Sequence, residues 1–533
     1  MFRAPSSRMK LHMILHSLTT GIYQLPTRAL RGVSLFRRSC AHPVKKALFA
    51  LAAVTLFLPG CARLPGGIEP QAQLLDPNTL DAGSAVRNEA ETGSPWPTAT
   101  WWKAYGDPQL DLLVEQATTD NPSLRLAQAR IARARSLAGG AKSVLWPRIN
   151  SSVVLSREKY LGQTYWDNDA LFDFVYNLDL WGKNRSALEA ALGKVKVAEA
   201  EARLVKLNLE TAVVRTYIAL SLQYTARDIA RTTLQQRRDI LAITQAREVA
   251  GLATEFERSQ AETPVPAARA ELESITEAIL LLHNQLSTLT GRGPGYGEAI
   301  VRPSPILDVP IQLPSTLPAD LLGRRPDVAA QRWRVESAGK SIKTAKAAFY
   351  PNINLTAYIG WSALGFAQFM SAGTLAHGFG PAITLPIFEG GRLRSELGVA
   401  TADYDEAVES YNATLLEALQ SVSDALVTLR SLDKQRSEAD KANALAKRAY
   451  DIAMRGYRAG LTNYLDVLNA QNQTLVEALR KAKVEARRLD AHALLMQALG
   501  GGADSNSSHA GFATGAADPG TQTSDTIVLA KRP

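Results

Sequence analysis

The side chains that could perform covalent or metal chemistry are few in this chain, and their spacing does not suit it. Among 533 residues there are two cysteines, Cys40 and Cys61, which excludes a disulfide framework and a zinc site made of several thiolates. The seven histidines are scattered and lack paired metal-ligand spacing. The sequence contains no nucleophile elbow, HExxH pair or strand followed by a P-loop, and a turn explains the glycines of residues 293–297 better. We therefore predict that the protein is not an enzyme and uses no cofactor.

Cys61 is the exception, because its surroundings suggest modification by lipid. Lys45 and Lys46 precede an apolar run over residues 47–58, which is typical of a secretory signal and too short for a spanning helix. The segment Leu58-Pro59-Gly60-Cys61 resembles a bacterial lipobox, in which the cysteine becomes the acylated N-terminus. The alternative is an ordinary signal with an incidental cysteine. By resemblance to Gram-negative lipoproteins, Ala62 favours sorting to the outer membrane.

The formal net charge of +9 does not indicate nucleic-acid binding. Residues 1–60 hold nine Lys or Arg and no Asp or Glu, so the rest of the chain holds 51 basic and 51 acidic residues and has no net charge. Once this segment is set aside, no basic stripe with interleaved aromatic residues remains.

Four landmarks occur twice in the same order, which indicates a fold built from two similar halves. The matched pairs are Asn121-Pro122 with Arg325-Pro326, Trp146-Pro147 with Tyr350-Pro351, 178–185 with 385–392, and 250–252 with 459–461. In both halves the aromatic-Pro pair lies 25 positions after the first landmark and is followed by a segment of alternating polarity.

Long helices should follow the third landmark in each half. Residues 183–250 and 391–459 contain no proline and are rich in Ala, Leu, Glu, Arg and Gln, so each should extend about 100 Å. Further helices should end near Gly291 and Gly500, and Pro264 and Pro266 should bend or interrupt the first of them. Small residues on more than one face favour a ring of coiled-coil helices; the alternative is a two-stranded or bundled coiled coil.

Four segments, about residues 148–158, 171–180, 352–362 and 378–387, have the alternation and length of tilted transmembrane strands. A sheet of four strands leaves two edges with unpaired backbone N–H and C=O groups, and lipid offers these groups no hydrogen-bond partner. Because single-chain barrels begin at about eight strands, several chains must close one barrel. The predicted fold class is therefore an α+β membrane protein, in which a long α-helical barrel or coiled coil continues a transmembrane β-barrel with four strands per protomer, built from two structural repeats.

The motifs on these elements resemble those of the TolC-like outer membrane efflux proteins, in the NodT-type lipoprotein branch that serves resistance-nodulation-division exporters. The resemblance covers about residues 95–502. Its motifs are Trp101-Trp102, 106–110 (GDPQL), Asn121-Pro122, 178–182 (LDLWG), 317–327 (LPADLLGRRPD), 347–351 (AAFYP), 385–392 (LPIFEGGR) and 499–502 (LGGG).

The resemblance implies a homotrimer with a twelve-stranded barrel in the outer membrane and a helical tunnel in the periplasm. The tunnel tip would dock a periplasmic adaptor (membrane fusion) protein, and an inner-membrane resistance-nodulation-division transporter would power transport. The chain itself would be a passive exit duct for small molecules such as drugs or toxic compounds, anchored in outer membrane lipid through Cys61.

The resemblance also implies a pore constriction on the helix after the second Gly-Leu turn. In relatives a Leu followed four positions later by an acid narrows the pore, and these positions fall on Leu465 and Asn469. Asn469 stands where an acid is common, and Asn472 stands where a base can occur, which weakens the case for an ionic latch. Three copies of Asp466 would form an acidic ring if it faces the lumen; the alternative is a solvated helix residue.

We divide the chain into an N-terminal extension with a signal peptide (1–60), a lipidated and equatorial segment (61–107), a first repeat (108–292), a connector (293–317), a second repeat (318–502) and a disordered tail (503–533). Residues 1–44 precede a complete signal, so we expect the protein to start near Val44. Two other functions stay open: an outer membrane channel for type I polypeptide secretion and a structural periplasmic coiled-coil lipoprotein. The motif set favours small-molecule efflux by family analogy.

Overall fold

The computed structural model describes residues 66–80, 96–160, 162–309 and 324–502, all of which belong to the second of two compact units, Arg63–Pro533. Cys61 and the tail 503–533 lie outside the described residues. The elements in chain order are η1 Pro77–Thr79, η2 Trp101–Tyr105, α3 Pro108–Asp120, α4 Pro122–Ser143, β1 Arg148–Tyr160, β2 Gln163–Asn177, α5 Lys183–Val249, α6 Glu255–Glu262, α7 Pro264–Leu289, η3 Pro294–Ala299, α9 Pro326–Ala347, β3 Asn352–Leu364, η4 Phe366–Gln368, η5 Ala372–Thr374, β4 Leu375–Thr384, α10 Arg392–Arg458 and α11 Tyr464–Ala498.

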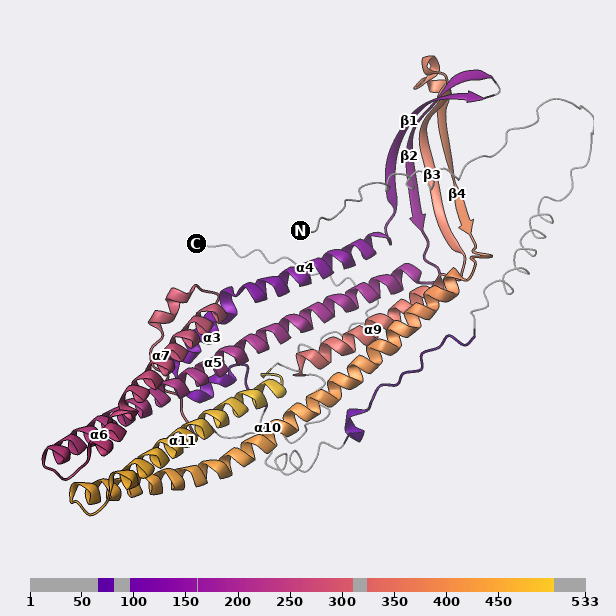
Figure 1. Ribbon diagram of the computed structural model, residues 1–533. Helices are drawn as coiled ribbons and strands as arrows, with labels where there is room; N and C mark the ends of the chain where they lie inside the picture. Colours follow the sequence, from indigo (N-terminus) through magenta and orange to yellow (C-terminus); the bar gives the residue numbers. More distant parts are fainter. Residues whose placement is uncertain (1–65, 81–95, 161, 310–323, 503–533) are drawn as a thin grey trace, which may run out of the picture. The chain divides into compact units, whose positions relative to one another are not determined.

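The order of elements occurs twice, as the sequence predicts. The first series is α4, β1, β2, α5, and the second is α9, β3, β4, α10 (Figure 1). Both short helices begin with proline at the first helical position, where no N–H is needed, and Asn121 caps α4 by accepting from the Ser123 N–H at 2.8 Å. Both long helices have 67 residues and begin after a glycine in the left-handed conformation, Gly182 or Gly391.

The four strands form one antiparallel sheet in the order β1-β2-β3-β4. The two halves join where β2 pairs with β3, with Asp173 opposite Tyr358. Among the described residues, β1 and β4 each have one neighbour, so each leaves one edge unpaired.

The helices beside the sheet follow the same order. Helix α4 packs on α5, α5 on α9, and α9 on α10, while α7 and α11 pack on the far half of α5 (Figure 1). Since α4 leads into β1 and β4 leads into α10, the two outer helices continue the two edge strands.

Two predicted strands are wrong in their boundaries. The second strand starts at Gln163, not near 171, and ends at Asn177, while the fourth spans Leu375–Thr384 and not 378–387. Residues 178–180 are not in the strand because Asp179 turns the chain into α5, where its carboxylate accepts from the Asn184 N–H at 2.8 Å.

The predicted effect of the prolines in the first tip helix is confirmed. The helix is interrupted at Thr263, where α6 ends and α7 begins with Pro264. Pro264 has no N–H to donate to the carbonyl four residues earlier, so the helical hydrogen-bond ladder stops there.

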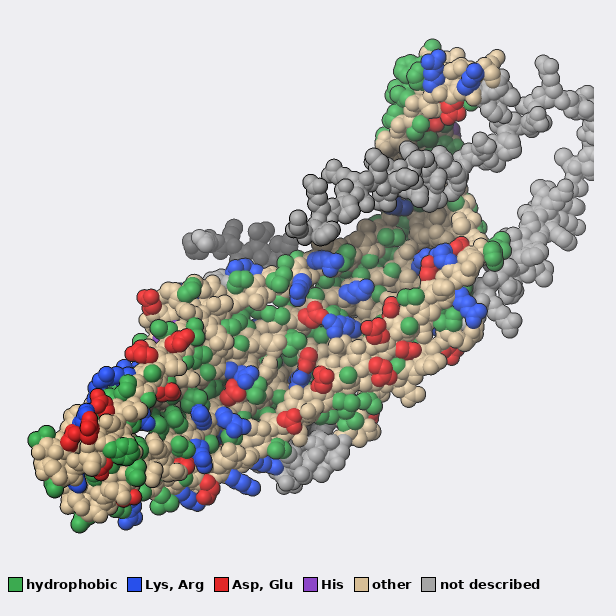
Figure 2. Space-filling model, in the orientation of Figure 1, with side chains coloured by type: hydrophobic (Ala, Val, Ile, Leu, Met, Phe, Trp, Pro, Cys, Tyr) green, Lys and Arg blue, Asp and Glu red, His purple; other side chains and the backbone are tan. Residues whose placement is uncertain are grey.

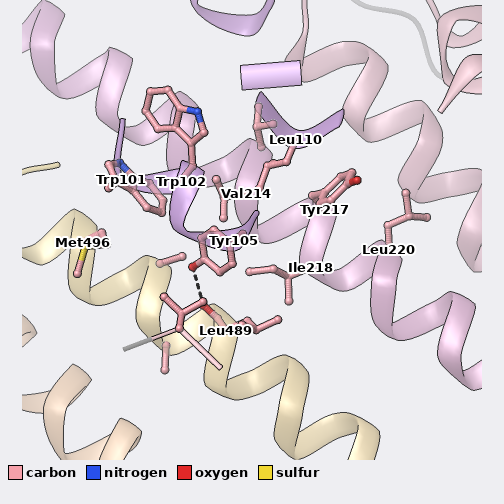
Figure 3. Packing of buried hydrophobic residues seen from close by; sticks show 14 of the residues in the cluster. Trp101, Trp102, Tyr105, Leu110, Val214, Tyr217, Ile218, Leu220, Leu489 and Met496 are labelled. Carbon is pink, nitrogen blue, oxygen red and sulfur yellow. Dashed lines mark hydrogen bonds between the residues drawn. The ribbon is translucent and has the colours of Figure 1, made fainter. Parts of the chain in front are cut away.

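The largest core cluster joins η2 to the long helices (Figure 3). Tyr105 is fully buried, and its hydroxyl donates to the Leu489 carbonyl at 3.0 Å. It also lies 3.1 Å from Nδ1 of His492. Burial, with Arg488 beside it, lowers the pKa of His492 to about 4, so the ring is neutral at physiological pH.

Asp107 connects three segments around this core. Its carboxylate caps α3 through the Gln109 N–H at 3.0 Å. It also accepts from the Tyr217 hydroxyl of α5 at 2.6 Å and from the Ser304 N–H of the connector at 2.8 Å. A single buried acid therefore fixes the segment 96–107 and the connector to the longest helix of the first half.

Residues 68–75 form a strap along α10. Backbone N–H groups of Gln71 and Ala72 donate to Asp405 at 3.0 Å, and Leu75 N–H donates to Asn412 at 2.9 Å. Ile68 packs in the cluster that contains Leu397, near the start of α10. The strap thus runs from the sheet end of α10 towards its middle.

The predicted fold class is confirmed: long helices continue a small antiparallel sheet, and two repeats supply them. Within the described ranges, no helix combines the length and apolarity that a membrane crossing demands.

Candidate conduit and its constriction

The two faces of the sheet differ in polarity. The strand register puts Ile149, Val153, Phe172, Phe174 and Ile359 on one face. It puts Asn150, Ser152, Asp169, Asp173 and Ser362 on the other face. An apolar face and a polar face on strands of 10 to 15 residues match the wall of a membrane barrel with an aqueous interior.

The polar face carries a column of acids that the sequence interpretation missed. Asp167, Asp169 and Asp173 follow one another on β2, and Glu158 lies on the same face of β1. The acids of β2 are two and four residues apart, and such even spacing is typical of side chains on one face of a strand. The sequence interpretation did not include Asp167 and Asp169 in a strand because the first residues of β2 are polar. Among the residues described, no His, Cys, Asp or Glu group is arranged to hold a metal ion.

Aromatic side chains flank both ends of the sheet. At the helix end, Trp181 stacks on Tyr350 with ring centroids 4.8 Å apart, and Phe388 is 89% exposed. At the other end, Trp166 and Phe366 pack edge to face at 6.2 Å. Such girdles are typical of the two interfaces of a membrane barrel.

The two hairpin tips at the far end of the helices share one design. Gly251 and Gly460 have φ of +70° and +76°, which favours glycine, and each is followed by a leucine whose N–H closes the end of the long helix at 2.8 Å. The next helix then starts with a capping box, Thr254 with Glu257 or Asn463 with Asp466. Val249, Leu252, Phe256 and Leu461 are exposed at these turns.

The tips are joined to each other within one protomer. The Thr244 and Tyr457 hydroxyls lie 3.0 Å apart, and the Arg247 guanidinium lies 5.0 Å above the Tyr457 ring. At the start of α11, the Tyr464 hydroxyl donates to the Gln260 carbonyl at 3.1 Å. Gln260 lies four residues before Pro264, so its carbonyl is the acceptor that this proline leaves without a helical donor.

The predicted constriction residues lie together on one helix face. Leu465, Asn469 and Asn472 are spaced by four and three residues on α11, and all three are exposed in the protomer. Val476 continues this face and is also exposed. The structure therefore brings these three together on a surface without a neighbour in the described protomer, as a pore-facing stripe requires.

Asp466 has a different role from its neighbours. It is the third residue of α11, its N–H donates to the Asn463 side chain at 2.9 Å, and its carboxylate accepts from the Asn463 N–H at 3.3 Å. This capping box accounts for an acid at that position without any pore function, although the side chain is exposed.

Comparison with known proteins decides the family. The model of the family described as outer membrane efflux protein matches residues 113–292 and 317–501. The chain belongs to the outer membrane efflux protein family.

Two relatives of this outer membrane efflux protein have names that refer to resistance. It is 38% identical to the fusaric acid resistance protein FusA of Burkholderia cepacia, over 90% of this chain and 94% of the relative. It is 29% identical to the multidrug resistance outer membrane protein MdtP of Escherichia coli K12, over 85% of this chain and 96% of that one.

Solved structures show the same fold. The crystal structure of the outer membrane protein VceC from Vibrio cholerae is 34% identical, covers 76% of this chain and 100% of its own, and has a TM-score of 0.71. The outer-membrane channel OprN is 26% identical, covers 82% and 99%, and has a TM-score of 0.73.

These likenesses confirm the predicted function, an outer membrane channel for efflux. They place the protein in a family of transport proteins. The helices of this chain correspond to the periplasmic part of such channels.

Proposed function

We propose that three copies of this chain close into one passive duct, which conducts toxic small molecules from the periplasm to the exterior as part of a tripartite efflux pump. The observation that carries the proposal is the pair of unpaired sheet edges, β1 and β4, on a sheet with an apolar face. In lipid each edge would expose a row of unsatisfied N–H and C=O groups, and only closure into a barrel removes them.

The helices support the same closure. The edges continue into α4 and α10, so β4 of one copy meets β1 of the next when α10 meets α4. This contact is head-to-tail, and a head-to-tail contact that closes generates a ring. Three copies supply twelve strands, the number that the family resemblance implies.

The tip surface is proposed to dock the adaptor protein. Val249, Leu252, Phe256 and Leu461 are 68% to 90% exposed at the hairpin turns, where the helical part ends. Exposed apolar side chains on rigid turns are typical of protein interaction sites. The power for transport would come from the inner-membrane resistance-nodulation-division transporter.

Lipid anchoring through Cys61 is proposed from the segment Leu58-Pro59-Gly60-Cys61, whose resemblance to a lipobox makes this cysteine the residue that would be acylated. Replacing it by Ser should abolish incorporation of labelled palmitate. Equal labelling of the Cys61→Ser variant would contradict the anchor.

For the cargo we propose small toxic organic compounds, including aromatic acids of the kind named in the fusaric acid resistance relative. Cells that lack the protein should accumulate such compounds, dyes or antibiotics, and plasmid-borne wild type should restore clearance while the native pump is expressed. If nothing changes under these conditions, polypeptide secretion or a structural role replaces efflux. Secreted proteins measured in the same cultures distinguish those two.

A further inference from the structure

We propose that the seam between neighbouring protomers is specified by charge: a basic stripe on α4 of one copy pairs with an acidic stripe on α10 of the next. This inference rests on the proposed ring and adds what selects its head-to-tail geometry. The occupant of each exposed stripe is a second copy of this chain.

The composition of the two outer helices is opposite. Helix α4 contains four arginines and one lysine and no acid. The half of α10 next to β4 begins with two arginines, Arg392 and Arg394, but from Ser395 to Leu429 it contains seven acids and no Lys, Arg or His. On the face shown in Figure 2, basic side chains gather over α4 and acidic ones over this part of α10.

Each of these helices also has an exposed stripe that is distinct from the one that packs inside the protomer. On α4, Ala127, Ile131 and Ala138 are buried by packing in the protomer. The exposed residues of its second stripe have the heptad spacing of four, three and four: Leu126, Arg130, Arg133 and Leu137.

Helix α10 repeats this pattern with the opposite charge. Leu397, Val408 and Leu415 are buried by packing in the protomer. The exposed residues of its second stripe alternate in spacing between three and four: Val399, Ala402, Glu406, Glu409, Ala413 and Leu416. Two charges of one sign, three residues apart and flanked by apolar or small residues, thus occur on both helices.

The two charged pairs lie at similar heights along the helices. Arg135 on α4 bonds Glu199 of α5 at 3.0 Å, and Glu201 of α5 pairs with Arg334 of α9. Gly339 of α9 faces the Tyr404 ring of α10. Helices α9 and α10 run in opposite directions, so Arg334, which precedes Gly339 by five residues, lies near the level of Glu409, which follows Tyr404 by five. The part of α4 around Arg133 lies near the same level, because Glu199 and Glu201 are neighbours on α5.

Most of these charges have no opposite charge beside them in the part of the protomer that the structure describes. In the ranges that the structure covers, no opposite charge lies within 4 Å of Arg130, Arg133 or Glu406, and Glu409 accepts only from the Asn412 amide, at 3.2 Å. Two α4 stripes facing each other would place like charges together, and so would two α10 stripes. Repulsion therefore disfavours two-fold pairs, and attraction favours the heterologous contact that closes a ring.

The test uses the full-length protein extracted from outer membranes in mild detergent. Arg130→Glu with Arg133→Glu, or Glu406→Arg with Glu409→Arg, should each shift the equilibrium from trimer to monomer by at least about tenfold at low salt. All four substitutions together should restore the trimer. The reversal Arg231→Glu with Arg238→Glu, at exposed positions of α5, which has neighbours on both sides in the protomer, should have no effect.

A second measurement locates the seam directly. Arg133→Cys combined with Glu409→Cys should give disulfides between protomers, and either single variant should give none. If the wild type is not trimeric, the proposed ring fails and this inference with it. If the wild type is trimeric but the reversals have no effect, or the fourfold variant is not rescued, the ring stands and the charge-specified seam is wrong.

Discussion

The hydrogen bond from Tyr464 to the Gln260 carbonyl should be worth more than an ordinary surface contact, because Pro264 leaves that carbonyl without its helical donor. We predict that Tyr464→Phe loosens the contact between the two hairpin tips. A net hydrogen bond contributes about 1 kcal/mol. The loss should therefore lower the free energy of local opening by that amount and increase the opening population about fivefold per protomer.

The decisive experiment is a double-mutant cycle with Pro264→Ala. With an N–H restored at position 264, the Gln260 carbonyl regains a helical donor, so the Tyr464 hydroxyl should contribute less. The two changes should then be non-additive by about 1 kcal/mol. Hydrogen exchange of the amides in α6 (Glu255–Glu262) reports the opening free energy of each variant.

The matched control is Tyr457→Phe, which removes a hydroxyl that contacts Thr244 and not Gln260. Its effect should add to that of Pro264→Ala. The reasoning fails if Tyr464→Phe changes exchange equally with and without the proline, because the hydroxyl would then act independently of the freed carbonyl.

Three further outcomes are expected. Burial raises the pKa of Glu210 to about 7 although Lys206 opposes the shift, so the folded chain keeps a proton that the unfolded chain loses above about pH 4.5. Stability should therefore fall as pH rises from about 4.5 to 7, by roughly 3 kcal/mol, and thermal melts of Glu210→Gln should lose this dependence. Asp107→Ala leaves three donors unpaired and should cost about 3 kcal/mol in chemical unfolding, whereas an unchanged midpoint would show that it does not join the segments. Leu465→Ala should raise single-channel conductance in planar bilayers, and an unchanged conductance would remove this residue from the constriction.

Much of the fold could be predicted because its signals are local. Proline and glycine positions mark the ends of α4, α5, α9 and α10, and the absence of proline predicts the length of the long helices. The boundaries of β2 could not be predicted, since its first residues are polar. Their acids suit a strand whose one face lines an aqueous pore, and alternation between apolar and polar residues is lost there.

The candidate site was predictable to a smaller extent. The stripe of Leu465, Asn469 and Asn472 follows from helical spacing, and the structure leaves it exposed. The capping role of Asp466 was not anticipated, although Asn463 three residues earlier is the signature of a capping box.

The sequence by itself determined the duplication, the order of the elements, the length of the two long helices, and the need for several chains to close one barrel. These depend on backbone chemistry: where N–H groups are missing, where a positive φ is required, and how many strands a closed sheet needs. The tertiary structure alone decided which distant residues meet, such as Tyr464 with Gln260, and which helix faces are left for a neighbour. Such pairings depend on packing between segments far apart in the chain, and local spacing does not encode which of two similar faces is buried.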